Sequence, residues 1–138
     1  RAAIAKAPEK AAESCGSIEG TWQASYPSYS CDAVVSFAGK TSSVFAMNQV
    51  GCGGIEGDIR QEGRRLRGNW RHPMCKGSLT VTLDASCNSG TGQWGVTPGQ
   101  TFCEGTHPVT MKRISAKKAR AFIQNGELNK LGSGGGDQ

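Results

Sequence analysis

The sequence has no hydrophobic run long enough to cross a membrane, few leucines, and aromatic residues at only 7%. It contains no Cys-x-x-Cys pair, so the spacing of zinc ribbons and thioredoxin-type motifs is missing. It contains no nucleophile-elbow motif, and only His72 and His107 offer imidazole groups. We therefore expect no membrane span, no enzyme activity, no cofactor and no resident metal.

Glycine, cysteine and positive charge are plentiful instead. The 138 residues include 20 glycines and 6 cysteines, and the formal net charge is +5. An even cysteine number in a small chain predicts three disulfides and an oxidising location: secreted, periplasmic or on the cell surface. Because the chain begins at Arg1 rather than Met, we expect a processed form or a fragment. The basic charge permits an acidic partner, although ordinary solubility charge explains it more simply.

Composition divides the chain into three parts. Residues 1–14 are rich in Ala and Lys and are predicted to be a flexible arm. Residues 15–126 are predicted to form one disulfide-stapled β domain with a C-terminal helix. Residues 127–138 are rich in Gly and are predicted to be a flexible tail or linker.

The clearest strand pair lies in GGIEGDIRQEGRRLRGNW, residues 53–70. If Glu62 and Gly63 form the turn, one face of the hairpin is apolar or glycine and the other is polar. The apolar face then pairs Ile55 with Trp70, Gly57 with Gly68, and Ile59 with Leu66. The polar face pairs Glu56 with Asn69, Asp58 with Arg67, and Arg60 with Arg65. A slip of one residue would mix the two faces, so the alternation specifies the strands strongly.

A short repeat follows the same alternation. CGSIEG (15–20) and CGGIEG (52–57) each place an Ile and a Gly inward and a Glu outward. We therefore interpret the repeat as one structural unit used twice, and Glu19 and Glu56 as solvated carboxylates. No convergent polar groups accompany them, which argues against a catalytic pair.

Further strands are predicted at residues 31–37, 42–50, 77–83, 89–94 and 107–114. Eight short antiparallel strands predict a mainly all-β meander, either a barrel or a sandwich. Ser115 is predicted to cap a short helix that ends at Gly126, with Ala119, Phe122 and Ile123 as its apolar stripe. Trp22, Trp70 and Trp94 all fall on inward positions.

Up-and-down strands also predict which cysteines meet. Cys31, Cys52, Cys75 and Cys103 fall at one end of the meander, and Cys15 and Cys87 fall at the other. The most economical pairs are Cys15–Cys87, Cys31–Cys52 and Cys75–Cys103.

The pattern resembles the calycin-type barrels, which comprise the lipocalins, the avidins and the bacterial metalloprotease inhibitors. Gly20-Thr21-Trp22 resembles the Gly-x-Trp of their first strand, and Arg113 resembles the basic residue late in their last strand. The resemblance implies an eight-stranded barrel, a cation–π contact between Arg113 and Trp22 at its closed end, and a helix after the last strand. No biotin-site constellation of the avidin kind is present. We expect three inward tryptophans to fill a barrel of this size, which favours a packed interior over a ligand cavity.

Two groups of residues are candidates for binding. Tyr26 and Tyr29 flank Pro27 in YPSY, which is typical either of a contact surface for protein or sugar or of a cap on the barrel mouth. The basic candidates are Arg64, Arg65, Arg67 and Arg71, which predict an anionic glycan or acidic protein surface as partner, or else a solvated face. His72 and His107, each before a Pro, are predicted to share a rim, either as a metal-binding pair or as ordinary turn residues.

From these residues we expect an exported, non-catalytic domain that recognises a protein or anionic glycan surface, with an inhibitor-like role among the options. A small-ligand carrier with a calycin-type cup, which would hold a small apolar ligand, is the alternative. Nucleic acid is not expected as a partner, because no aromatic residues are interleaved with the arginines for base stacking.

Overall fold

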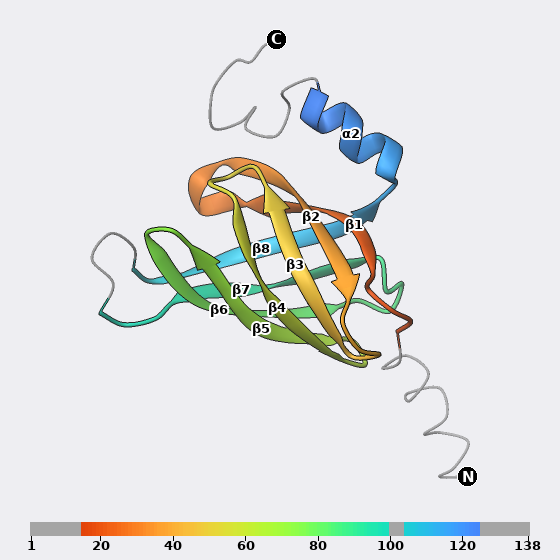
Figure 1. Cartoon of the computed structure of the whole chain (residues 1–138), viewed down its shortest axis with the longest axis horizontal. Helices are drawn as coiled ribbons and strands as arrows, with labels where there is room; N and C mark the ends of the chain where they lie inside the picture. Colours follow the sequence, from red (N-terminus) through yellow and green to blue (C-terminus); the bar gives the residue numbers. More distant parts are fainter. Residues whose placement is uncertain (1–14, 100–103, 125–138) are drawn as a thin grey trace.

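The structure is a computed structural model that describes residues 15–99 and 104–124. Within them, eight antiparallel strands form one closed barrel (Figure 1). The strands are β1 (Gly20–Tyr26), β2 (Cys31–Gly39), β3 (Val44–Val50), β4 (Ile55–Glu62), β5 (Arg65–His72), β6 (Cys75–Leu83), β7 (Ser89–Val96) and β8 (Thr106–Ile114). A 3-10 turn, η1 (Pro27–Tyr29), joins β1 to β2, and helix α2 (Ala116–Gln124) follows β8. The predicted arm 1–14, the predicted tail 127–138 and the predicted helix end at Gly126 lie outside the described residues.

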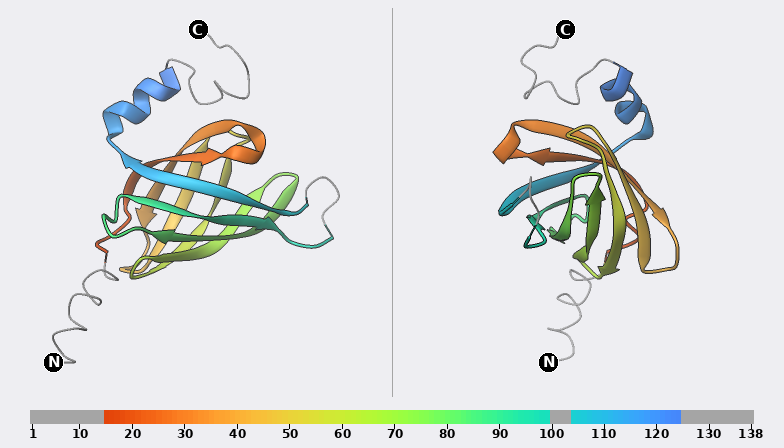
Figure 2. Two further views of the ribbon diagram at one scale, coloured as in Figure 1. Left: turned by 180° about the vertical axis from the view of Figure 1, so that it is seen from behind. Right: turned by 60° about the vertical axis from the view of Figure 1, so that its left-hand side comes forward.

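The topology is a simple meander. Each strand pairs with the next one along the chain, and β8 returns to pair with β1, where Arg113 lies opposite Trp22. The pairing of β8 with β1 decides for a barrel and against the sandwich that the sequence left open. Figure 2 shows the strands wound around a common interior, with α2 outside the barrel wall.

Side chains alternate between the interior and solvent with the predicted period of two. The alternation is complete along β6, where all the inward positions from Cys75 to Leu83 are buried and all the outward ones are exposed. The core includes Ile18, Trp22, Phe45, Ile59 and Val81, none of which exposes more than 2% of its surface. The predicted inward and outward faces are therefore right for these strands.

The predicted register of the β4–β5 hairpin is wrong by two residues. Gly63 and Arg64 form the turn, so Gly57 rather than Ile55 lies opposite Trp70. Gly63 has a φ of 63° and occupies the first central position, where type II′ turns place glycine. A shift of two residues keeps every side chain on its predicted face. It changes the pairs, so Arg60 faces Arg67, and Arg65 faces Glu62.

Helix α2 begins as predicted and packs against the outside of the barrel. The hydroxyl of Ser115 accepts a hydrogen bond of 3.0 Å from the backbone N–H of Lys118, which caps the helix. Ala119 is buried with Val34 of β2, and Phe122 is partly buried beside them. Ile123 is 46% exposed, so its predicted place in the apolar stripe is wrong. The outward-facing Val34, which the helix covers, takes part in this contact instead.

Two of the predicted disulfides are present, one at each end of the barrel. Cys15–Cys87 joins the segment before β1 to the turn between β6 and β7, and Cys31–Cys52 joins the start of β2 to the turn between β3 and β4. The third predicted pair, Cys75–Cys103, includes Cys103, which lies outside the described residues. A count of three disulfides therefore stays a prediction.

Candidate functional site

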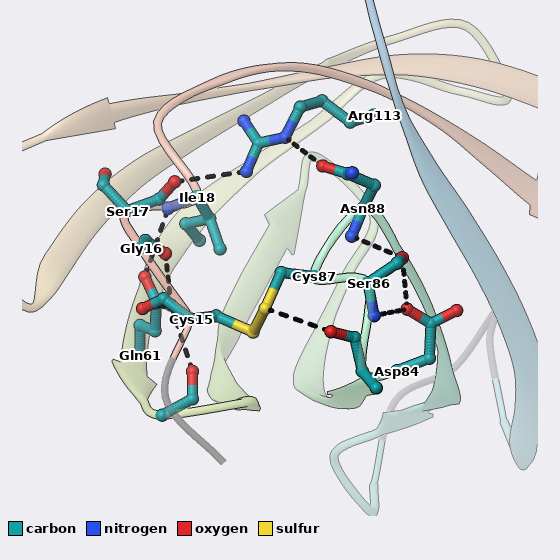
Figure 3. Close-up of a disulfide and its surroundings, with 12 residues drawn as sticks. Cys15, Gly16, Ser17, Ile18, Gln61, Asp84, Ser86, Cys87, Asn88 and Arg113 are labelled. Atoms are coloured by element: carbon teal, nitrogen blue, oxygen red, sulfur yellow. Dashed lines mark hydrogen bonds between the residues drawn. A yellow bond between two sulfur atoms is a disulfide. The ribbon is translucent and has the colours of Figure 1, made fainter. Parts of the chain in front are cut away.

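One end of the barrel is closed by Arg113 and Trp22. The guanidinium carbon of Arg113 lies 4.5 Å from the centroid of the Trp22 ring, which is fully buried. Arg113 also donates hydrogen bonds to the backbone oxygen of Ser17, at 3.1 Å, and to Oδ1 of Asn88 (Figure 3). It donates another hydrogen bond of 3.1 Å to the backbone oxygen of Glu19. The contact that the calycin resemblance implies is therefore present, and it ties the segment before β1 across the barrel end.

Gln61 and a disulfide complete this closed end. The Gln61 Nε2 donates to the backbone oxygen of Gly16 at 2.9 Å, and its Oε1 accepts from the backbone N–H of Ile18 at 3.2 Å. The Cys15–Cys87 disulfide lies beside this hydrogen-bonded segment (Figure 3). These contacts therefore hold the segment before β1 against this end of the barrel.

The opposite end of the barrel is hollow. It holds a cavity of about 380 Å³, which we call the cup. Its described lining residues are Tyr26, Tyr29, Met47, Gln49, Cys52, Ile55, Trp70, His72, Cys75, Leu79, Trp94, Glu104 and His107.

The cup shows that the predicted packed interior is wrong for the open half of the barrel. Trp22 lies at the closed end, under Arg113. Trp70 is held against the wall, because its Nε1 donates to the backbone oxygens of Ser78 and Gly95. Trp94 is only partly buried and lines the cup near its rim. Three inward tryptophans therefore occupy different levels of the barrel and leave the mouth unfilled.

Aromatic rings form much of the cup wall. The Trp70 and Trp94 rings are nearly perpendicular, at 81° with centroids 5.5 Å apart, and Tyr26 meets Trp94 at 86° and 6.1 Å. At the rim, Tyr29 and His107 lie over Trp94, with centroid distances of 5.8 and 4.7 Å. Ring faces and edges therefore surround one space from several directions. The Nε1 of Trp94 is buried and has no acceptor among the described residues.

A buried polar pair lies within this apolar wall. The hydroxyl of Tyr26 donates a hydrogen bond to Oε1 of Gln49, and Nε2 of Gln49 donates to the backbone oxygen of Gly51 at 3.2 Å. Gln49 is only 5% exposed. Burial raises the pKa of Tyr26 well above its usual range, and the hydrogen bond with Gln49 opposes part of that rise. The phenol is therefore a neutral group.

Both histidines line the cup, as the prediction of a shared rim requires. Nδ1 of His72 accepts a hydrogen bond of 3.1 Å from the backbone N–H of Met74. Nε2 of His107 lies 3.1 Å from the backbone oxygen of Glu104, which only accepts, so this nitrogen carries the proton. Nδ1 of His107 lies 3.3 Å from the hydroxyl of Ser28. Within residues 15–99 and 104–124, no three potential metal ligands come together.

The structure separates the two predicted groups of binding residues. Tyr26 is buried in the cup and Tyr29 lies at its rim, 56% exposed, which fits a cap on the barrel mouth better than a flat contact surface. The predicted arginines are instead on β5 and the turn before it: Arg64, Arg65, Arg67 and Arg71.

These arginines lie among carboxylates on the outside of the barrel. Arg67 lies 3.3 Å from a carboxylate oxygen of Glu62, and Arg71 lies 3.9 Å from one of Asp58. Asp58 also binds Lys40 at 3.0 Å. Ion pairs as exposed as these contribute little to the stability of the fold. They do neutralise part of the positive charge that the arginines bring to this surface.

Sequence reasoning did not single out Gln49, Met47, Leu79 or Glu104 as cup residues. A signal for Gln49 was present, because it shares the inward parity of Phe45 and Met47 on β3. A polar residue at an inward position needs a partner inside the barrel, and here that partner is Tyr26. No comparable signal marks Glu104, since its place at the cup depends on the fold of the segment between β7 and β8.

The chain matches no protein-family model, and no curated protein matches it in sequence. Among the described residues, no helix has the length and apolar character needed to cross a bilayer.

Proposed function

We propose that this domain binds a small, largely apolar organic molecule in the cup, as a carrier or a sensor rather than as an enzyme. The observation that supports this proposal is the hollow open end of the barrel, with about 380 Å³ of space and a mostly aromatic and aliphatic wall. Small-molecule sites are typically apolar concavities of about 300–1,000 Å³ with a few placed polar groups. The cup has that composition.

The cup also has a rigid frame, which lowers the entropy lost on binding. At the opposite end of the barrel, hydrogen bonds from Arg113 hold the segment before β1 in place. At the rim of the cup, the Cys31–Cys52 disulfide fastens the β3–β4 turn to the start of β2, and Cys52 lines the cavity. A ligand would therefore enter a site that is already formed.

The polar groups of the cup support binding rather than catalysis. Tyr26 is neutral and hydrogen-bonded to Gln49, and the protonated nitrogen of His107 is engaged by a backbone oxygen. These contacts orient the groups toward the protein instead of toward a reacting atom. We further propose an extracellular or periplasmic location, which the disulfides support.

Recognition of a protein or an anionic glycan surface, including an inhibitor-like role, is the second candidate. Exposed apolar side chains at the open end favour it, since Tyr29 and Met74 expose 56% and 51% of their surfaces and Val50 is also exposed. The arginines of β5 support the anionic version, although Arg67 and Arg71 already have carboxylate neighbours.

Binding of the neutral fluorescent dye N-phenyl-1-naphthylamine tests the cup. We expect saturable fluorescence enhancement with wild-type protein. Ile55→Trp should reduce dye affinity at least tenfold, because Ile55 lines the cup and the larger indole occupies its space.

Glu56→Trp is the matched control, because Glu56 is the next residue of β4 and faces solvent. It should leave dye affinity within about twofold of wild type, as surface substitutions usually do. Equal affinity of the two variants would show that the dye binds elsewhere, and absence of binding by wild type would count against the proposed function.

A further inference from the structure

The charge of the cup differs from that of the whole chain. The chain carries a formal net charge of +5. Among the described lining residues, however, there is no Lys or Arg, and Glu104 is the one acidic residue. The lysines and arginines of β4, β5 and β6 lie on outward, exposed positions instead. An anion that entered the cup would meet no Lys or Arg side chain there, whereas a cation would meet Glu104.

The aromatic walls favour the same sign of charge. The face of an aromatic ring is the negative end of its quadrupole, and it attracts ammonium groups. Tyr26 and Trp70 each stand nearly perpendicular to Trp94, and Tyr29 lies over Trp94 at the rim. Rings in several planes around one space are the arrangement found in sites for alkylated ammonium groups.

Several hydrogen-bond donors of the cup are committed to the protein itself, whereas the Nε1 of Trp94 has no acceptor among the described residues. The Tyr26 hydroxyl donates to Gln49, Gln49 donates to the backbone of Gly51, and His107 donates to the backbone of Glu104. The Nε1 of Trp70 donates to two backbone oxygens. An anionic ligand would need such donors, whereas an alkylated ammonium ion needs none.

From these three observations we propose that the cup selects organic cations, meaning an amine or quaternary ammonium group carried on an apolar body. This inference rests on the proposed function and names the chemical class of its ligand. The ammonium group lies among the aromatic rings with Glu104 at the rim, and the apolar body extends toward Leu79 and Met47.

Three probes of similar size and different charge test the inference on the disulfide-intact protein. Phenyltrimethylammonium and tert-butylbenzene have nearly the same shape but differ by one positive charge, and benzenesulfonate carries a negative charge. Each competes with N-phenyl-1-naphthylamine for the cup, and calorimetry measures the binding of the cation directly. We expect the cation to bind roughly tenfold more tightly than its neutral isostere, the size of a partly desolvated cation–π effect. Benzenesulfonate should not compete.

Two variants connect the selectivity to named residues. Tyr29→Leu should weaken binding of phenyltrimethylammonium about three- to tenfold and leave tert-butylbenzene almost unaffected. Tyr29→Phe keeps a ring at this exposed position and should keep the affinity for the cation. Glu104→Gln should weaken cation binding about two- to fivefold, as expected for an exposed charge.

The outcomes separate the two proposals. If tert-butylbenzene displaces the dye as well as the cation does, the cup binds small molecules but the inference about charge is wrong. If neither the dye nor any probe binds, the proposed function fails as well. Equal losses for cation and isostere in Tyr29→Leu would also overturn the assignment of the ring to charge recognition.

Discussion

At the residue scale, the Tyr26–Gln49 pair explains how polar groups are tolerated inside the apolar cup. Both side chains are almost fully buried, and each satisfies the other. A buried polar group without a hydrogen-bond partner costs about 1–3 kcal/mol of stability. In this pair, each side chain provides the partner that the other needs inside the cup. Because desolvation disfavours the phenolate, burial raises the pKa of Tyr26 far above its ordinary value, despite the opposing hydrogen bond.

This raised pKa predicts an alkaline loss of stability. Below about pH 10 both the folded and the unfolded chain hold the Tyr26 proton, so the group adds no pH dependence. Above that pH the unfolded chain releases the proton while the folded chain keeps it, so the free energy of unfolding falls. The slope approaches about 1.4 kcal/mol per pH unit for one proton. Urea unfolding between pH 9 and 11 measures it.

Tyr26→Phe should remove this part of the slope, because the titrating group is gone. Tyr29→Phe leaves Tyr26 in place and should keep it, which makes it the matched control. If Tyr26→Phe and wild type lose stability equally between pH 10 and 11, the buried phenol is not the cause.

At the element scale, the glycines beside Trp70 determine how closely the strands approach. Gly77 lies opposite Trp70 in the β5–β6 pair, and Gly57 lies opposite it in the β4–β5 pair. A Cβ at Gly77 would lie 1.8 Å from the backbone oxygen of Gly95 and 2.8 Å from Cζ2 of Trp70. Neither atom is free to move, because one is backbone and the other belongs to a ring held by two hydrogen bonds.

Gly77→Ala should therefore destabilise the barrel by about 3 kcal/mol, in the upper range for overpacking. Gly16→Ala is the control, because a Cβ there meets no atom within 4 Å, and it should change stability by less than about 0.5 kcal/mol. The midpoints of urea unfolding compare the two. A loss below about 1 kcal/mol for Gly77→Ala would mean that the β6–β7 pairing relaxes easily.

The same elements show what alternation in the sequence can and cannot predict. Parity separates the inward Ile59 from the outward Asp58, and the structure agrees. Parity does not distinguish registers that differ by two residues, because both keep the same faces. The position of the turn, at Gly63-Arg64 rather than Glu62-Gly63, decided the register of β4 and β5. Ile123 illustrates the same limit on α2, since its spacing fits the stripe but its side chain is exposed.

At the scale of the whole molecule, the alternation of inward and outward residues along the strands could not predict the cup. Parity predicted that Trp22, Trp70 and Trp94 point inward, and they do. Parity does not tell how far along the barrel axis each ring lies. It therefore could not show that the open end of the barrel is left unfilled. Trp22 fills the closed end, while Trp94 is only partly buried at the mouth.

The two described disulfides lie at opposite ends of the barrel, so we expect their removal to have different effects. Cys15–Cys87 spans 72 residues at the closed end, and Cys31–Cys52 spans 21 at the rim of the cup. In the chain-entropy account, closing the longer loop contributes about 4 kcal/mol and closing the shorter one about 3 kcal/mol.

Replacing both members of each pair with Ala should therefore lower the free energy of unfolding in both cases, more for Cys15–Cys87. Ligand affinity should respond in the opposite order. Removing Cys31–Cys52 releases the turn that lines the cup and should weaken dye or phenyltrimethylammonium binding several-fold, since a looser site must be ordered on binding. Removing Cys15–Cys87 leaves the rim intact and should leave affinity unchanged while the protein is folded. Urea unfolding and dye titration of the two double variants measure both effects. Equal affinity losses would mean that the rim disulfide does not organise the cup.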